Sequence, residues 1–152
     1  MPIRITDTEA KAYGITTRHE TMDNGSRRFR LIAGDGSSYI RCENSGRPVW
    51  ENSHSHSTLR ELILVQNGEL IFCEHKGGKT TYTLLREGDQ AVTTPGIPHN
   101  NCMSEDSVVH TIKFGDCTKQ DWIPSPELDG QTKLLSFEEA KARCEPKGND
   151  GQ

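Results

Sequence analysis

Three histidines and one glutamate in the middle of the chain are residue types that bind metal ions. His54 and His56 are separated by one residue, Glu61 follows, and His99 lies further along. On a strand, alternate residues share a face, so the two Cα atoms would lie about 6.5 to 7 Å apart. Both imidazoles can then converge on one ion at about 2.1 Å from each nitrogen. A solvated loop is the other interpretation, because residues 51–58 are polar throughout.

Glu61 and His99 each need a particular backbone path to join the pair. Glu61 heads the first strongly apolar segment and lies an odd number of residues after His56. One continuous strand would put it on the opposite face, so a turn or bulge within residues 57–60 must intervene. His99 follows a Pro-Gly-Ile-Pro loop that fixes where its strand begins. The alternatives are a solvent-facing strand end for Glu61 and an edge-strand histidine for His99.

The elements around these residues are expected to be strands joined by turns. Apolar runs at 61–65 and 70–73 flank Asn67-Gly68, a dipeptide typical of type I′ hairpin turns. Further strands are expected at 29–32, 38–42, 80–85, 90–93 and 108–114. This regular spacing, without intervening helices, indicates an all-β barrel or sandwich.

The two ends of the chain differ from this strand pattern. Residues 7–13 are compatible with one or two helical turns. A capping box predicts a helix over 137–144. The polar, glycine-rich residues 145–152 are expected to be disordered. We divide the chain into an N-terminal extension at 1–27, a β-barrel domain at 28–116 and a C-terminal extension at 117–152.

Composition points to one small domain that associates with itself. The chain has 152 residues, 32% of them hydrophobic, and a mean hydropathy of −0.73. A thin-walled barrel suits so modest an apolar content. Leu62 and Leu64 are expected to alternate away from the barrel interior and to need cover. We therefore expect a homodimer.

Charge and cysteine usage exclude several classes of partner. A formal net charge of −4 and a pI near 5.9 argue against nucleic acid. No apolar stretch is long enough to cross a bilayer, and the first residues lack the apolar core of a signal peptide. Five cysteines without a C-x-x-C pair suit free thiols in a reducing compartment. We expect a cytoplasmic protein with a small-molecule substrate.

Residues 40–115 resemble the cupin superfamily, and both of its motifs have counterparts here. The first motif is His-x-His, four residues, Glu, six residues and Gly, and it is matched by His54, His56, Glu61 and Gly68. The second runs from a Gly to a Pro-x-Gly-x-Pro-His segment, and it is matched by Gly88, Gly96, Pro98 and His99. The chain departs from the pattern at Thr94, Met103 and Pro48, where Pro, Asn and Gly are expected. None of these departures removes a ligand.

The resemblance implies an all-β, cupin-type β-barrel, or jelly roll, with short helices at the N- and C-terminal ends. It also implies that the three histidines and Glu61 bind a metal inside the barrel. Three imidazoles and one carboxylate suit Fe, Mn, Ni, Cu, Co or Zn better than Mg or Ca. We expect one divalent transition-metal ion per subunit as the cofactor.

Four further residues are candidates for binding a substrate. Asn101 and Met103 alternate with His99 along its strand, and Tyr39 and Arg41 alternate on theirs. Filling of the barrel is the alternative for Asn101 and Met103. An outward surface charge is an equal alternative for Arg41.

His110 and Glu61 are the candidate catalytic residues. His110 shares a strand face with Ile112 and Phe114, which would make it an inward-facing proton shuttle. A packed barrel histidine is the favoured alternative. Trp122 lies beside a proline-containing loop, where it would either form a rim over the barrel mouth or pack within the loop.

The function that these residues favour is a metal-dependent enzyme acting on a small, oxygen-rich molecule. A non-heme dioxygenase would use open metal positions for substrate and O₂. A non-redox isomerase, lyase or cyclase would use the ion as a Lewis acid. The ligand set serves both chemistries, and a non-catalytic ligand-binding cupin is a third class.

Overall fold

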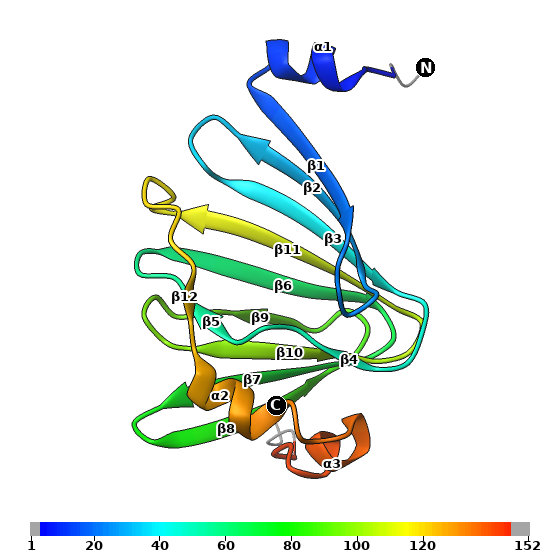
Figure 1. The fold of residues 1–152 in the computed structure, drawn as a ribbon, viewed down its shortest axis with the longest axis vertical. Coiled ribbons are helices and arrows are strands. Elements are labelled where there is room, and N and C mark those ends of the chain that lie inside the picture. Colours follow the sequence, from blue (N-terminus) through cyan, green and yellow to red (C-terminus); the bar gives the residue numbers. More distant parts are fainter. Residues whose placement is uncertain (1–3, 147–152) are drawn as a thin grey trace, which may run out of the picture.

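The computed structural model describes residues 4–146 and consists of two antiparallel sheets with short helices at the chain ends (Figure 1). The first sheet has the order β1 (Ile15–Thr21), β2 (Arg27–Ala33), β3 (Ser38–Asn44), β11 (Ser107–Gly115), β6 (Leu59–Asn67) and β9 (Gln90–Val92). The second has the order β12 (Ile123–Pro124), β5 (His54–Ser55), β10 (His99–Met103), β7 (Leu70–Lys76) and β8 (Lys79–Leu85), and β4 (Val49–Trp50) also pairs with β10. The helices are α1 (Asp7–Ala12), α2 (Pro126–Thr132) and α3 (Phe137–Ala142). None of the helices among these residues is long and apolar enough to span a membrane.

The strands confirm the all-β prediction, but the turn at Asn67-Gly68 does not form the predicted hairpin. β6 lies in the first sheet and β7 in the second, so the chain crosses between sheets at this turn. Only Gly68 has a positive φ, of 80°, whereas a type I′ turn needs two. The reason is that both strands are apolar on their inner faces. They bury those faces by packing across the interior instead of pairing edge to edge.

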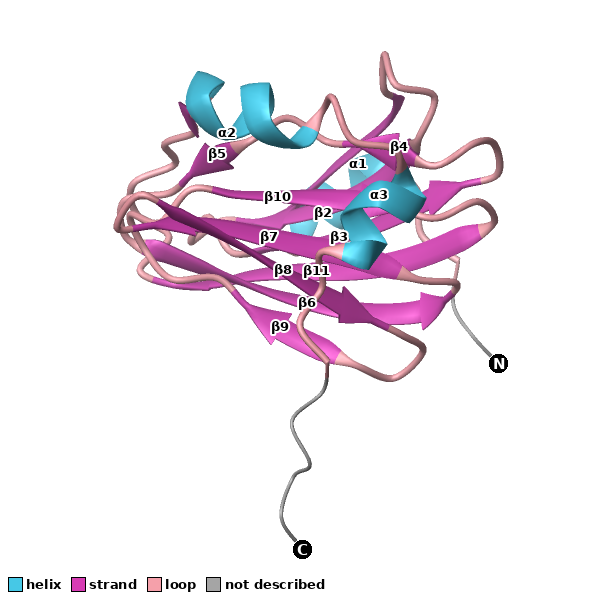
Figure 2. Cartoon of the chain, turned by 90° about the horizontal axis from the view of Figure 1, so that it is seen from below, coloured by secondary structure: helices cyan, strands magenta, loops and turns pink. Residues whose placement is uncertain are grey.

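The core lies between the two sheets. β6 and β11 contribute Ile63, Val65 and Val109, and the second sheet contributes Leu70, Phe72, Leu85 and Met103. A second cluster lies on the outer face of the second sheet, where Ile71, Cys73, Tyr82 and Cys102 pack against Phe137 and Ala140 of α3. Helices α2 and α3 thus cover this sheet (Figure 2). Cys102 points away from the interior, because it lies an odd number of residues after His99 on β10.

Both chain ends contribute ordered elements to this architecture. β1, within the first 27 residues, pairs with β2 from Ile15↔Ala33 to Thr21↔Arg27 and extends the first sheet. The predicted helices near both ends are present as α1 and α3, each with a capping box. α2 was not predicted, because a segment with Gly130 in its middle has a weak helical pattern. Of the tail predicted to be disordered, residues 147–152 lie outside the described residues.

The outer face of the first sheet carries a row of apolar side chains that crosses its strands. Cross-strand register aligns Leu31, Tyr39, Ile112, Leu62 and Val92 in this row. Leu31, Ile112 and Val92 are each more than 40% exposed. The same face also carries charges of both signs, such as the Arg41–Glu43 ion pair at 2.8 Å. A face with an apolar row and both charges is suited to self-association about a two-fold axis.

We propose that a second copy of the chain covers this row, as the composition predicts. Sedimentation at micromolar concentration is expected to give twice the 17.0 kDa chain mass. Ile112→Lys should give the monomer, because it places a charge in the apolar row. Leu134→Lys, at a position that is 83% exposed elsewhere, should leave the dimer intact. A wild-type protein that sediments only as the monomer would rule out this dimer.

Buried thiols make the stability of the fold sensitive to alkaline pH. All five cysteines are free. Burial raises the pKa of Cys102 to about 12 and also raises that of Cys73. In the unfolded chain a thiol titrates near about 8.5. The folded state therefore holds these protons more tightly, and its stability is full below that pH and is lost as pH rises toward the folded pKa values.

We expect the free energy of unfolding in urea to fall between pH 8.5 and pH 11. Each of these two thiols contributes at most about 1.4 kcal/mol per pH unit. Cys73→Ala should show a shallower fall than wild type, because one of the titrating groups is gone. An equal slope in both proteins would contradict the role assigned to Cys73.

Candidate metal centre

The four predicted ligands come together at one point between the sheets. One ligand atom from each of His54, His56, Glu61 and His99 lies within 4.8 Å of the others. His54 on β5 and His99 on β10 are direct cross-strand partners. Glu61 comes from β6 in the other sheet, so the chain crosses between sheets after His56. This crossing is the turn that the spacing required within residues 57–60.

Backbone carbonyls orient the three imidazole rings. Nδ1 of His54 lies 2.8 Å from the carbonyl of Asn52, and Nδ1 of His56 lies 2.6 Å from that of Asp121. Nδ1 of His99 lies 3.5 Å from the Ile97 carbonyl. A carbonyl only accepts hydrogen bonds, so each Nδ1 carries a proton in these contacts. A ring that is neutral and protonated at Nδ1 presents its Nε2 lone pair, the form that binds metal.

The Nε2 atoms all face the carboxylate of Glu61. They lie 3.9 Å from it for His54, 2.8 Å for His56 and 3.3 Å for His99. Nε2 of His99 is buried and has no hydrogen-bond partner among the described residues. Nε2 of His56 forms a hydrogen bond to Glu61 in this arrangement, and a bound metal ion would take the place of that proton. The four residues therefore fit a divalent metal ion.

Burial and mutual contact set the protonation states of these groups. Burial alone would raise the pKa of Glu61, but its contacts with His54, His56 and His99 hold that pKa well below its ordinary value. Burial lowers the pKa of His54, and its contact with Glu61 only partly opposes that effect. Glu61 is thus ionised and His54 is neutral near pH 7, the states that metal binding requires.

The C-terminal segment completes the site, which sequence reasoning missed. Asp121 supplies the carbonyl to His56, and its side chain accepts a hydrogen bond from the Ser57 amide at 3.0 Å. The ring of Trp122 stacks on that of His54 with centroids 5.1 Å apart. β12 then pairs with β5, which carries His54. The only sequence signal for this role of the C-terminal segment was Trp122, which was expected to form a rim or to pack within its loop. In the structure it packs on His54.

A cavity of about 480 Å³ adjoins the cluster and reaches Glu61 and His54. Asn101 and Met103 line it, as their alternation with His99 predicts. Its remaining walls come from β1, β2, β3 and β11 of the first sheet.

Three candidate residues lie outside this cavity. On β3 the cavity is lined by Ser38, Ile40 and Cys42, which puts Tyr39 and Arg41 on the outer face. On β11 it is lined by Val109, Thr111 and Lys113, which puts His110 on the outer face as well. There His110 bonds to Tyr39 at 2.7 Å and to Gln66 at 2.6 Å. Strand parity thus places Tyr39, Arg41 and His110 on the outer face. This corrects two assignments, that of Tyr39 and Arg41 as substrate-binding residues and that of His110 to the barrel interior.

Basic residues on β1, β2 and β11 line the cavity and were not predicted as site residues. They are Arg18, Arg28, Arg30 and Lys113. For Arg30 and Lys113 the available signal was their alternation with apolar neighbours on both sides. Arg18 was missed because β1 was assigned to an extension and not to the sheet.

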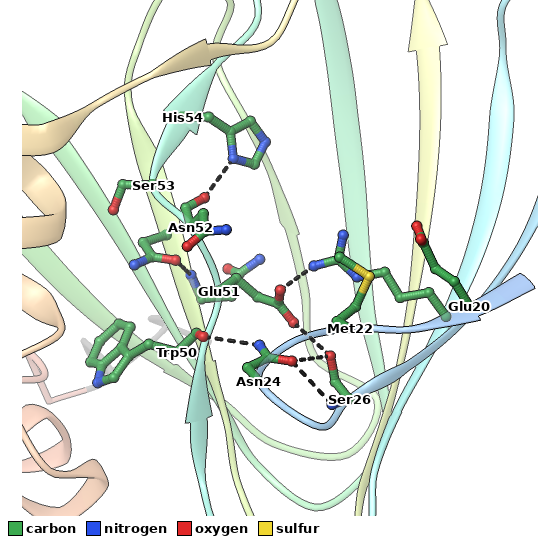
Figure 3. Close-up of polar contacts among 12 residues, drawn as sticks. Glu20, Met22, Asn24, Ser26, Trp50, Glu51, Asn52, Ser53 and His54 are labelled. Carbon is green, nitrogen blue, oxygen red and sulfur yellow. Dashed lines mark hydrogen bonds and ion pairs between the residues drawn. The ribbon is translucent and has the colours of Figure 1, made fainter.

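A polar network braces the cavity wall between β1–β2 and the segment that leads into β5 (Figure 3). Asn24 donates to the Trp50 carbonyl at 3.0 Å and accepts from the Ser26 hydroxyl at 2.7 Å. Glu51 forms a close ion pair with Arg28. These contacts fix the strands that carry the arginines relative to the ligand-bearing segment.

No family model matches the chain, and neither does any curated protein. Solved structures do. A RmlC-like cupin from Shewanella frigidimarina is 15% identical over 73% of this chain and 86% of its own, with a TM-score of 0.52. The CENP-C cupin domain of Drosophila melanogaster is 19% identical over 64% and 75%, with a TM-score of 0.52. Oxalate decarboxylase from Bacillus subtilis is 14% identical over 84% of this chain but 37% of its own, with a TM-score of 0.59.

These similarities show that the chain has the cupin fold, as its two motifs predicted. The jelly-roll arrangement of two sheets with short terminal helices agrees with that prediction.

Proposed function

We propose that the protein is a metal-dependent enzyme that converts a small, oxygen-rich molecule in the cavity. One divalent transition-metal ion would be held by His54, His56, Glu61 and His99. The observation that carries this proposal is that the cavity opens directly onto two of the four candidate ligands. It is lined by Glu61 and His54, whereas His56 and His99 are buried and do not line it. Substrate would therefore approach the ligand set from one side only.

The chemistry that we favour is that of a non-heme dioxygenase. A redox-active ion with nitrogen and oxygen ligands supplies positions at which O₂ and a substrate can both bind. The protein supplies a partly apolar pocket, with Leu70, Met103 and Val109 in its wall. Such a wall excludes water and strengthens each polar contact inside. The Mn(II) centres of oxalate decarboxylase support metal chemistry on this fold.

Non-redox chemistry is the second candidate, and Lys113 is the observation that favours it. Its Nζ lies 3.8 Å from Oε1 of Glu61. A fixed ammonium group beside a Lewis-acidic ion stabilises negative charge that develops on a substrate oxygen. Isomerase, lyase and cyclase reactions through an enolate would use this arrangement.

Elemental analysis of the purified protein, with visible and EPR spectra, tests the proposal. We expect about one ion per chain and a spectrum that changes on exposure to O₂. Colourless zinc would replace the dioxygenase with the Lewis-acid alternative. Azide should perturb the spectrum, because the cavity leaves the ion accessible. A spectrum that ignores added ligands, in a protein that unfolds on chelation, would make the site structural.

Glu61→Gln is expected to change activity far more than folding. The substitution removes a charge at the ion and almost no volume. Turnover and metal content should both fall, while the far-UV circular dichroism stays that of the wild type. Gln90→Glu, on the neighbouring strand β9 and away from the cavity, serves as the control for a single carboxylate change. Full activity in Glu61→Gln would remove this residue from the catalytic set.

All five cysteines are free thiols, which supports the proposal that the protein acts in the cytoplasm.

A further inference from the structure

The cavity wall is more basic than the rest of the chain. Four cations, Arg18, Arg28, Arg30 and Lys113, line it against the three carboxylates Glu20, Glu51 and Glu61. The lining thus has a net charge of +1, in a chain whose formal net charge is −4. A divalent ion at the ligand cluster would raise the charge of the cavity to +3. Such a concentration of positive charge in a partly apolar pocket attracts anions.

Of the arginines that line the cavity, Arg18 and Arg30 are not both neutralised. Arg18 and Arg30 are direct cross-strand partners, and like charges in that position repel. Both contact the same carboxylate oxygen, Oε1 of Glu20: Arg18 at 3.5 Å and Arg30 in a close ion pair. One carboxylate therefore serves two guanidinium groups, and one positive charge is left over.

Arg28 is paired with Glu51, yet one of its N–H donors has no partner. Its guanidinium forms a close ion pair with Glu51, and both side chains are largely buried. The Nε atom of Arg28 is buried and has no hydrogen-bond partner among the described residues. The same holds for Oδ1 of Asn101 in this cavity. A buried donor and a buried acceptor without partners are costly unless a ligand satisfies them.

Lys113 provides the second positive site, at the metal end. It lies on the inner face of β11, opposite Ser38 of β3, and its Nζ contacts Glu61. An ion bound to Glu61 would compete for that carboxylate, so the Lys113 ammonium becomes available to another anion. The Cα atoms of Lys113 and Arg30 are separated by two strand spacings and two residues, about 12 Å. Two long side chains and a small molecule together span that distance.

We propose that the substrate is a small organic dianion, a dicarboxylate bound with one carboxylate at Lys113 beside the metal and the other at Arg18 and Arg30. This inference rests on the proposed function for the role of the metal. The unpartnered donor of Arg28 and the unpartnered acceptor of Asn101 suit a hydroxyl or carbonyl group between the two carboxylates. The net positive charge of the cavity, the arginine charge that Glu20 leaves over and the unpartnered polar atoms all favour a dianionic ligand.

Calorimetric titration with three matched probes tests this inference. Succinate carries two negative charges, butyrate carries one, and succinamide is neutral with the shape of succinate. Each is titrated into metal-loaded protein and into chelated protein whose metal content has been measured. We expect succinate to bind at least 10-fold more tightly than either other probe in the loaded protein. It should bind more weakly, in the same order of preference, in the chelated protein.

Three substitutions locate the binding groups. Lys113→Met keeps the aliphatic stem and should weaken succinate and butyrate by about 10- to 100-fold, the loss of one charge-assisted hydrogen bond. Arg18→Met leaves the Arg30–Glu20 pair intact and should weaken succinate while leaving butyrate unchanged. Lys79→Met removes one exposed charge at the start of β8 and should change neither probe by more than about 2-fold. Lys113→Arg should restore most of the affinity.

Each result bears on one proposal at a time. Equal affinity for succinate and succinamide, or unchanged binding in Lys113→Met with normal metal content, overturns the dianion inference and leaves the metal enzyme standing. A protein that takes up no metal but prefers succinate supports the anion site and removes the metal-dependent function. Loss of binding in Lys79→Met as large as in Lys113→Met would show attraction to the overall charge and overturn the site.

Discussion

Replacing His99 or His56 by alanine is expected to abolish stoichiometric metal binding while the sheets stay folded. Each imidazole is held by a backbone carbonyl and aimed at Glu61. Changes in groups that merely orient a ligand typically weaken metal binding about 10- to 100-fold, so loss of the ligand itself should exceed about 100-fold. The fold should survive, because the apolar core between the sheets consists of other residues, of which Phe72 contacts the ring of His99.

The measurement is metal content per chain after dialysis against a weak chelator, with far-UV circular dichroism as the check on folding. His110→Ala is the matched control, because His110 lies on the outer face of the first sheet. It should keep the metal content of the wild type. Wild-type metal content in both His56→Ala and His99→Ala would refute the four-residue centre.

Leu128→Ala is expected to lower the free energy of unfolding by about 2 to 5 kcal/mol. Leu128 is fully buried in α2, which packs on β10. The helix is tied to this strand by a hydrogen bond from Asn100 to Thr132 at 3.1 Å. Leu134→Ala, two residues beyond α2 and 83% exposed, makes the same chemical change without burial and should cost almost nothing.

Leu128→Ala should also weaken metal binding, because α2 anchors the segment that supports the candidate ligands. Asp129 of α2 accepts a hydrogen bond from the Ser53 amide at 2.8 Å, beside His54. The Asp121 carbonyl that orients His56 lies just before β12. Urea unfolding and a competitive metal titration on both leucine variants measure the two effects. Equal results for Leu128→Ala and Leu134→Ala would mean that α2 supports neither the fold nor the site.

Much of the site follows from local spacing. His54 and His56 alternate, and the proline-rich loop fixes the start of the strand that carries His99. The need for a turn before Glu61 follows from parity alone. Such features depend on a few neighbouring residues, and the structure places all four side chains together. The placement of Asn101 and Met103 in the cavity follows from the same alternation.

The faces of β3 and β11 could not be assigned in this way. Alternation shows which residues share a face but not which face is inside, and both faces of the first sheet carry apolar side chains. Alternation therefore made Tyr39 a candidate for binding the substrate and His110 a candidate for the interior, although the two bond to each other on the outer face. Pairing of β11 with β3 and β6, which are distant in the sequence, decides this orientation.

The sequence by itself determined the strand-rich class of the fold, the four candidate ligands and their donor chemistry. Only the tertiary structure brought Arg18 and Lys113 into one cavity and folded Asp121 back onto His56. The physical reason is the range of the interactions. Strand alternation and turn chemistry are local, whereas sheet order and the packing of chain ends are set by contacts between residues far apart in the sequence.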